Sequence, residues 1–155
     1  MRGLDTILVP VDFSETSDHA LDYATGLAAA FGASLRLLHV VSDADVSPGT
    51  EAFWGFDENA VQRRWIDEAT TKLDAVARDE GRRELRVEIA VEIGSPFVAI
   101  VRHARERSVD LIVMGTHGRG AVKHLLLGSV AEQVVRHAPC PVLTVRLPDH
   151  RFERP

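Results

Sequence analysis

The apolar residues of this chain gather in five short runs, separated by longer stretches of mixed polarity. The run at 6–11 is nearly continuous, which predicts a strand that is buried on both faces of a sheet. The run at 85–93 alternates instead, with Arg86, Glu88 and Glu92 opposite its apolar side chains, and this predicts a half-exposed strand at an edge. The predicted strands are residues 6–11, 34–41, 85–93, 111–114 and 142–145.

Between these runs, apolar residues recur every three or four positions, which is the spacing of an amphipathic helix. Ser14 is placed to cap the N-terminus of the first helix, and Gly32 is placed to end it. Residues 61–76 predict the second helix, and Ser95 followed by Pro96 is a typical start for the third. The face of the first helix that we expect to be buried consists of Ala20, Leu21, Ala24, Leu27, Ala28 and Phe31.

The alternation of strands and helices predicts a single α/β domain over residues 1–147, followed by a flexible polar tail at 148–155. Such a chain forms a parallel sheet with helices on both faces, which is a three-layer sandwich. Right-handed crossovers leave few strand orders. The edge character of 85–93 favours the flavodoxin-like order 3-2-1-4-5 for the five strands. A long loop at 42–57 is expected to form a lid or an interface, or to pack on its own core.

The strand predicted at 111–114 runs directly into glycines at positions 115, 118 and 120, and another helix is predicted to begin near position 128. A buried strand followed by glycines and a helix N-terminus binds phosphate in many parallel α/β proteins, because glycine lets backbone N–H groups approach an anion. In the order 3-2-1-4-5, ligands bind at the carboxyl ends of strands one and four, where the strand order reverses. The stretch therefore predicts a phosphate-binding site, although glycines that only turn the chain are an alternative.

Backbone amides of the glycine-rich stretch are expected to supply most of the phosphate contacts. Amides around Gly115, Gly118 and Arg119 are expected to face phosphates, with further amides from a helix N-terminus at Gly128 and Ser129. Arg119 is either a direct partner of a phosphate or a solvated surface charge. Ser129 also has an alternative interpretation, because a glutamate follows it at the spacing of a capping box.

The first strand ends at Asp12, whose carboxylate is expected to accept hydrogen bonds from a ribose or a base, or else to cap the first helix. Val40 and Val41, at the end of the neighbouring strand, are expected to present backbone groups and an apolar wall to a base. Asp12 is the one candidate for a general base beside the glycines and is better placed for the nucleoside, so no catalytic residue is assigned. His117 and His124 lack a supporting cluster of carboxylates or thiols, so no metal site is expected.

Composition argues against several other functions. The net charge of −5 argues against general nucleic-acid binding. No apolar stretch approaches the length that spans a bilayer and no signal peptide is recognisable, so a cytoplasmic location is expected. The P-loop motif G-x-x-x-x-G-K-[ST] and a dinucleotide-binding G-x-G-x-x-G after the first strand are both absent. The single cysteine, Cys140, is expected to be a buried structural thiol.

The glycine-rich stretch resembles the ATP-binding signature of the universal stress protein family, in which two glycines separated by two residues are followed, after nine residues, by a Gly-Ser pair. The residues that match this signature are Gly115, Gly118, Gly128 and Ser129. The likeness extends through the segments 7–15, 115–120 and 125–145, and therefore covers both ends of the chain. The segment 42–84 matches only in its periodicity, and Ala121 stands where the family often has glycine.

This resemblance implies the fold predicted above, as an adenine nucleotide alpha hydrolase-like domain, and it implies that ATP is bound. It also implies a homodimer through the last strand, Val142–Val145, whose apolar edge fits pairing across a twofold axis. The residues implied near the adenosine are Pro10, Val11, Asp12 and Val41, those at the crevice floor are Met114 and Gly115, and those around the phosphates are Gly118, Arg119, Gly128, Ser129 and Val130.

Three kinds of function fit these expectations. The first is a cytoplasmic stress-response protein that binds ATP with Mg²⁺ and acts as a nucleotide-dependent signalling or protective module, without nucleic-acid or membrane partners. The second is a slow ATPase or phosphotransferase, for which the sequence offers no convincing general base or water-positioning residue beside the glycines. The third is an interaction protein whose pocket binds AMP or is vestigial.

Overall fold

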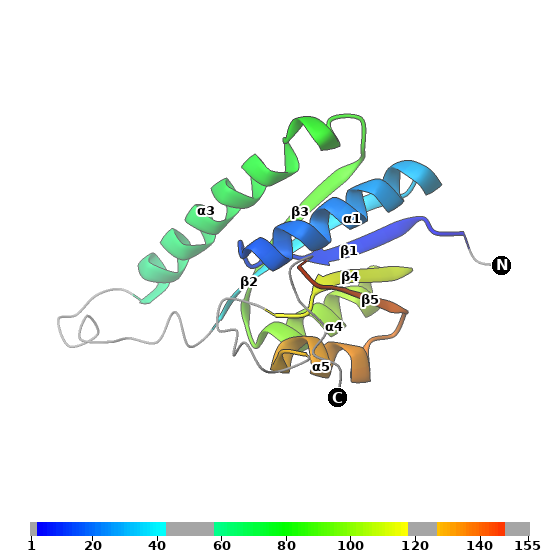
Figure 1. Cartoon of the computed structure of the whole chain (residues 1–155). Coiled ribbons are helices and arrows are strands. Elements are labelled where there is room, and N and C mark those ends of the chain that lie inside the picture. Colours follow the sequence, from blue (N-terminus) through cyan, green and yellow to red (C-terminus); the bar gives the residue numbers. More distant parts are fainter. Residues whose placement is uncertain (1–2, 43–57, 118–126, 148–155) are drawn as a thin grey trace.

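The computed structural model describes residues 3–42, 58–117 and 127–147, which form a three-layer α/β sandwich (Figure 1). The loop at 43–57, the predicted site residues Gly118 and Arg119 and the tail at 148–155 lie outside the described residues. The elements, in chain order, are β1 (Thr6–Pro10), α1 (Glu15–Phe31), β2 (Ser34–Ser42), α3 (Glu58–Ala77), the 3-10 helix η2 (Glu80–Arg82), β3 (Val87–Gly94), α4 (Pro96–Glu106), β4 (Leu111–Gly115), α5 (Ser129–His137) and β5 (Val142–Val145).

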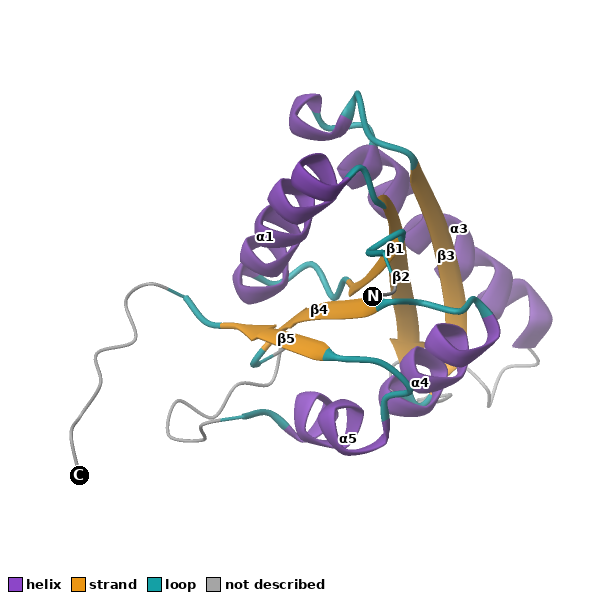
Figure 2. Ribbon diagram, turned by 90° about the vertical axis from the view of Figure 1, so that its right-hand side faces the viewer, coloured by secondary structure: helices purple, strands orange, loops and turns teal. Residues whose placement is uncertain are grey.

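The five strands form one parallel sheet in the order β3-β2-β1-β4-β5, which confirms the predicted order. β1 lies in the centre, where Ile7 pairs with Leu35 of β2 and with Leu111 of β4. β3 lies at one edge, as its alternating pattern predicts, and β5 lies at the other. Helices α1 and α3 cover one face of the sheet, and α4 and α5 cover the other (Figure 2).

The sheet separates two apolar cores, because successive side chains of a strand point to opposite faces. On β1, Ile7 and Val9 lie in the core beneath α1 and α3, whereas Leu8 lies in the core beneath α4 and α5. The residues of α1 that are buried as predicted are Ala20, Leu21, Ala24 and Ala28. Phe31, also predicted to be buried, is 64% exposed. It is the last residue of α1, and the left-handed backbone of Gly32 (φ 69°) turns the chain beside it into β2, so no further helical turn extends the buried face past it.

The helix starts follow local sequence signals and lie at the carboxyl edge of the sheet. Ser14 caps α1, since its hydroxyl oxygen accepts a hydrogen bond from the N–H of Ser17 at 3.3 Å. Ser95 is the N-cap of α4, with Pro96 at the first helical position. Because a helix follows each of β1 to β4 in the chain, the N-terminal ends of the helices lie at the edge of the sheet where a ligand site is predicted.

Candidate functional site

The crevice predicted between strands one and four corresponds to a separation of β1 and β4. The two strands pair through Ile7 with Leu111 and Leu8 with Ile112, and both strands then continue beyond this pairing. Pro10, the last residue of β1, has no N–H with which to extend a ladder. This pairing therefore ends before the carboxyl ends of the two strands, at the position where the strand order reverses.

The turn between β1 and α1 is held by side-chain hydrogen bonds. Asp12 Oδ1 accepts hydrogen bonds from the backbone N–H of Ser14 at 3.0 Å and from the hydroxyl of Ser14. The N–H of Asp12 donates to the hydroxyl oxygen of Ser17 at 3.2 Å, and Ser17 is buried. Ser14 is the cap of α1, so the interpretation of Asp12 as that cap is wrong. Asp12 instead orients the capping residue and is fixed at the end of β1.

Phe13 and His39 support this turn, although neither is among the predicted site residues. Phe13 has a left-handed backbone with φ of 62°, which costs a residue other than glycine about 1–2 kcal/mol. Its ring lies against the ring of His39, with centroids 4.6 Å apart. His39 belongs to β2, and its Nδ1 lies 2.7 Å from the carbonyl oxygen of Val11. The available signal was a histidine in a mostly apolar strand, because a buried polar ring requires a hydrogen-bond partner.

The end of β4 is fitted to α1 by close backbone contact. A Cβ atom added to Gly115 would lie 2.8 Å from Cγ2 of Thr16 and 3.1 Å from the carbonyl oxygen of Thr16. The first turn of α1 therefore requires glycine at this position, whatever binds in the crevice. Met114, the preceding residue, is buried in the core beneath α4 and α5. The close packing against Thr16 is a reason for glycine at position 115. This reason differs from the predicted one, which is the approach of an anion to the backbone.

Gly128 brings the N-terminus of α5 to the end of β4. Its N–H donates to the carbonyl oxygen of Thr116 at 2.7 Å, and an added Cβ would lie 3.1 Å from the same oxygen. The first hydrogen bond of α5 runs from the N–H of Glu132 to the carbonyl of Gly128 at 2.9 Å. The amide of Gly128 is thus used within the protein, and the amides of Ser129 and Val130 precede the first intrahelical bond at the positive end of the helix.

Ser129 does not cap α5, so the capping-box interpretation is wrong. Gly128 is the N-cap, and Ser129 is the first residue of the helix, with an exposed side chain. Glu132, which would complete a capping box, forms an ion pair with Arg136 one turn later, at 3.0 Å. The helix begins one residue earlier than a cap at Ser129 requires, so capping does not account for this serine.

The structure places most of the predicted site residues at one edge of the sheet. They are Pro10, Val11 and Asp12 at the end of β1, Val41 in β2, Met114 and Gly115 at the end of β4, and Gly128, Ser129 and Val130 at the start of α5. The side chains of Val11, Val41 and Met114 are buried, so these residues can offer a ligand backbone groups rather than exposed side chains. Gly118 and Arg119 lie outside the described residues.

The carboxylates of Asp12, Asp18 and Asp22 lie near one another around the start of α1, with Arg82 as a nearby cation. Burial, followed by the nearby carboxylates of Asp22 and Asp12, raises the pKa of Asp18 above its usual value. An anionic ligand at this edge therefore needs positive compensation, from a side chain such as Arg119 or from a divalent cation. In residues 3–42, 58–117 and 127–147, no three His, Cys, Asp or Glu side chains are grouped to hold a metal ion. Cys140 is half-buried, and burial raises the pKa of its thiol, which favours a structural thiol over a nucleophile.

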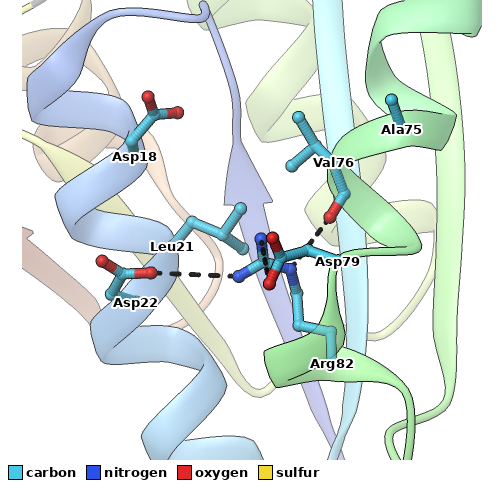
Figure 3. Close-up of a pocket in the computed structure, with 7 residues that line it drawn as sticks. All are labelled: Asp18, Leu21, Asp22, Ala75, Val76, Asp79 and Arg82. Atoms are coloured by element: carbon cyan, nitrogen blue, oxygen red, sulfur yellow. Dashed lines mark hydrogen bonds and ion pairs between the residues drawn. The ribbon is translucent and has the colours of Figure 1, made fainter.

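A separate cavity of about 350 Å³ lies between α1 and α3 (Figure 3). Arg82 reaches into it, and its Nε donates to the carbonyl oxygen of Val76 at 3.0 Å. Its terminal nitrogens lie 3.9 Å from a carboxylate oxygen of Asp22 and 3.7 Å from one of Asp79. These ion pairs connect α1 to the end of α3. The cavity contains none of the predicted site residues.

Comparison with known proteins identifies relatives of both the sequence and the fold. The model of the universal stress protein family matches residues 3–146. Universal stress protein MJ0577 of Methanocaldococcus jannaschii is 30% identical to this chain over 155 residues, which cover 90% of this chain and 93% of the relative. The solved structure of MJ0577 matches with a TM-score of 0.82 at 31% identity and covers 96% of this chain and 99% of that chain.

Two further solved structures have the same fold. Universal stress protein UspA from Lactobacillus plantarum matches with a TM-score of 0.78 at 28% identity, covering 94% of this chain and 100% of that chain. A universal stress protein solved in complex with cAMP matches with a TM-score of 0.60 at 28% identity, covering 94% of this chain and 98% of that chain. In the described part of this chain, every helix is too short or too polar to cross a membrane.

Proposed function

The chain belongs to the universal stress protein family, and we propose that it binds ATP with Mg²⁺ in the crevice between β1 and β4 and acts as a nucleotide-dependent signalling or protective module. The observation that carries this proposal is the hydrogen bond from Gly128 to Thr116, at 2.7 Å, which sets the N-terminus of α5 against the end of β4. A helix N-terminus at a strand end favours phosphate, because its first N–H groups lack intrahelical acceptors and the helix dipole is positive there.

The nucleoside would bind at the turn between β1 and α1. Asp12 is held there by Ser14 and Ser17, and a carboxylate fixed in this way suits the hydroxyl donors of a ribose or the amino group of a base. Pro10 and Val41 lie at the ends of adjacent strands, and Val41 would contact the base through its backbone groups.

The phosphates would bind at the start of α5. The amides of Ser129 and Val130, in the first turn of α5, would donate to phosphate oxygens, and Gly118 and Arg119 would complete the phosphate contacts. Mg²⁺ would be held mainly by phosphate oxygens and water, which is common for this ion in nucleotide sites. The charge of Mg²⁺ would also offset the acidic surroundings of Asp12 and Asp18.

A smaller adenine nucleotide is the second candidate ligand. One universal stress protein of similar fold has been solved in complex with cAMP, which supports a monophosphate such as AMP in this crevice. Hydrolysis receives less support, because Asp12, the one candidate for a general base in the sequence, already accepts hydrogen bonds from the amide and hydroxyl of Ser14. Binding is therefore favoured over a slow ATPase or phosphotransferase.

We also infer a homodimer that pairs through β5 and a cytoplasmic location. β5 is an edge strand, and an edge strand presents backbone groups that a second strand can pair with. Leu143 on this strand is 38% exposed, so an apolar side chain accompanies the unpaired edge. A second copy of the chain would cover both across a twofold axis.

Substitution of Gly118 tests the proposed phosphate site. Gly118→Val should weaken ATP binding by tenfold or more, because its methyl groups would occupy the space of a phosphate, while the melting temperature stays unchanged. Gly26→Ala is a matched control, since an added Cβ at Gly26 meets nothing within 4 Å and the residue lies on the exposed face of α1. Equilibrium dialysis with labelled ATP and Mg²⁺ measures both variants, and an unchanged dissociation constant for Gly118→Val would contradict the assignment.

A further inference from the structure

We propose that His39 is a positioning residue for the nucleoside end of the site, an inference that rests on the proposed function. The imidazole ring is bonded to the carbonyl of Val11 and packs against Phe13. Asp12 lies between Val11 and Phe13 in the chain. His39 therefore contacts the residue on either side of the carboxylate that would bind the nucleoside. His39 would act on the ligand through this turn and not by touching the ligand.

The hydrogen bond between His39 and Val11 connects β2 to the chain directly after β1. Nδ1 of His39 lies 2.7 Å from the carbonyl oxygen of Val11. A carbonyl oxygen only accepts hydrogen bonds, so Nδ1 carries the proton in this contact. The N–H of Val11 donates to the carbonyl oxygen of Leu38 at 2.8 Å, so both backbone groups of Val11 are directed to β2. His39 is 8% exposed and Val11 is 3% exposed, which shields the bond from water.

Phe13 needs support from outside its own turn. Its φ of 62° lies in the left-handed region that residues other than glycine rarely adopt, and such residues persist where their surroundings hold them in place. The hydrogen bonds of Asp12 with Ser14 and Ser17 hold the α1 side of the turn. The ring of His39, whose centroid is 4.6 Å from that of Phe13, supports the β2 side.

The phosphate end of the site is positioned by a different contact. The N-terminus of α5 is placed by the hydrogen bond from Gly128 to Thr116, which involves neither β2 nor the turn after β1. A change at His39 should therefore move the nucleoside contacts and leave the phosphate contacts in place. The change should lower the affinity for every ligand that carries the nucleoside by the same factor, whatever the number of its phosphates.

Two amide substitutions separate the hydrogen bond from the rest of the side chain. His39→Asn keeps an N–H donor at the δ position, as in Nδ1, whereas His39→Gln places its donor one bond farther, as in Nε2. His39→Gln should weaken the binding of ATP and of AMP by a common factor of about ten, the effect expected for one buried hydrogen bond. His39→Asn should lose less affinity than His39→Gln, because it keeps the donor to Val11 and lacks only the ring against Phe13. Calorimetric titration at 25 °C gives the affinities, and thermal unfolding confirms that each variant is folded.

Each other outcome overturns this assignment. An unchanged affinity in His39→Gln, with ATP bound by the wild-type protein, would show that the turn does not depend on His39. A greater loss for ATP than for AMP would link His39 to the phosphates, and an equal loss in both variants would exclude the δ-position donor as the cause. Absence of binding to the wild-type protein would instead contradict the proposed function itself, together with this inference.

Discussion

The two strand ends that flank the crevice are built in different ways. At the end of β1, Asp12 is held by hydrogen bonds from side chains and by the packing of Phe13 against His39. At the end of β4, an added Cβ at Gly115 would collide with the side chain of Thr16 at 2.8 Å, and one at Gly128, before α5, would lie tightly at 3.1 Å from the carbonyl oxygen of Thr116. At the end of β1, individual hydrogen bonds can be removed one at a time. At the end of β4, the Cβ atom of one added alanine is enough to disturb the packing. The first end should therefore respond gradually to substitution and the second abruptly.

Gly115→Ala should have the largest effect on stability. The added Cβ would lie 2.8 Å from Cγ2 of Thr16 and within 3.2 Å of its backbone carbonyl carbon, so α1 or β4 must shift. Overpacking of this kind costs about 1–3 kcal/mol. Urea denaturation measures the free energy of unfolding.

Thr16→Ser in the same chain removes the nearest atom of this contact. The double variant should recover part of the lost stability, and only part, because the Thr16 backbone contacts at 3.1 and 3.2 Å remain. Equal stability of Gly115→Ala and the wild-type protein would show that the end of β4 is less tightly fitted than the structure indicates.

Ser14→Ala should have a moderate effect at the end of β1. It removes the hydroxyl that caps α1 and that donates to Asp12, while the backbone N–H of residue 14 still donates to Asp12, and loss of an N-cap costs about 1 kcal/mol. Ser34→Ala is a suitable control, since it removes an exposed hydroxyl that bonds to the carbonyl oxygen of Asp5 at 3.0 Å. The melting temperature should fall more for Ser14→Ala than for Ser34→Ala, and a reversed order would argue against the capping assignment.

Glu92 shows how a side-chain network behaves away from the crevice. Burial alone would raise its pKa, but hydrogen bonds and positive charges from His103 and Arg102 lower the pKa of Glu92 below its usual value of 4.5. Its contribution to stability is therefore present above pH 4.5 and is lost as the pH falls through the folded-state pKa. Glu92→Gln should lower the free energy of unfolding by about 1 kcal/mol at neutral pH. Chemical denaturation at several pH values should show the variant and the wild-type protein converging in acid.

Asp18→Asn should have the smallest effect and the opposite sign. The raised pKa of Asp18 means that its ionisation destabilises the folded state, so the free energy of unfolding decreases as the pH rises from the usual value of 3.8 through the folded-state pKa. At neutral pH the variant should gain up to about 0.5 kcal/mol, as is typical of a partly exposed site. Thermal unfolding at acidic and neutral pH measures this gain, which should disappear in acid.

Asp12 provides a control for this prediction, because its charge contributes to the raised pKa of Asp18. In an Asp12→Asn background, Asp18→Asn should gain less stability than it does in the wild-type protein. A full-sized gain in that background would show that the two carboxylates do not interact.

Much of the fold could be predicted because it follows from local rules. A continuous apolar run predicts a buried strand, and Val142–Val145 has the predicted boundaries. Gly32 ends α1 in the left-handed conformation that its position suggests. The alternation of 85–93 places β3 at an edge, and that assignment, with right-handed crossovers, leads to the observed strand order. Periodicity and turn chemistry are properties of neighbouring residues, so a single sequence displays them.

The rest of the candidate site depends on contacts between distant segments. The distance between Thr16 and Gly115 and the bond between His39 and Val11 exist only once the sheet is assembled, so no local pattern indicates them. Ser129 illustrates the opposite case, in which a local pattern is present but the helix begins one residue earlier than the pattern requires. Spacing can indicate which residues approach a ligand. Why each residue type is required at its position becomes clear only from the contacts of the assembled fold.

Calorimetric titration of ATP with Mg²⁺ into nucleotide-free protein, with AMP in parallel, tests the central claim most directly. We predict one ATP bound per chain, with a lower dissociation constant for ATP than for AMP, because the additional phosphates would meet the N-terminus of α5. Equal affinity for the two ligands would mean that the two additional phosphates of ATP contribute nothing to binding. That result would contradict their contact with α5 and leave only the nucleoside contacts at Asp12. Absence of heat and of binding for both would contradict the nucleotide assignment as a whole.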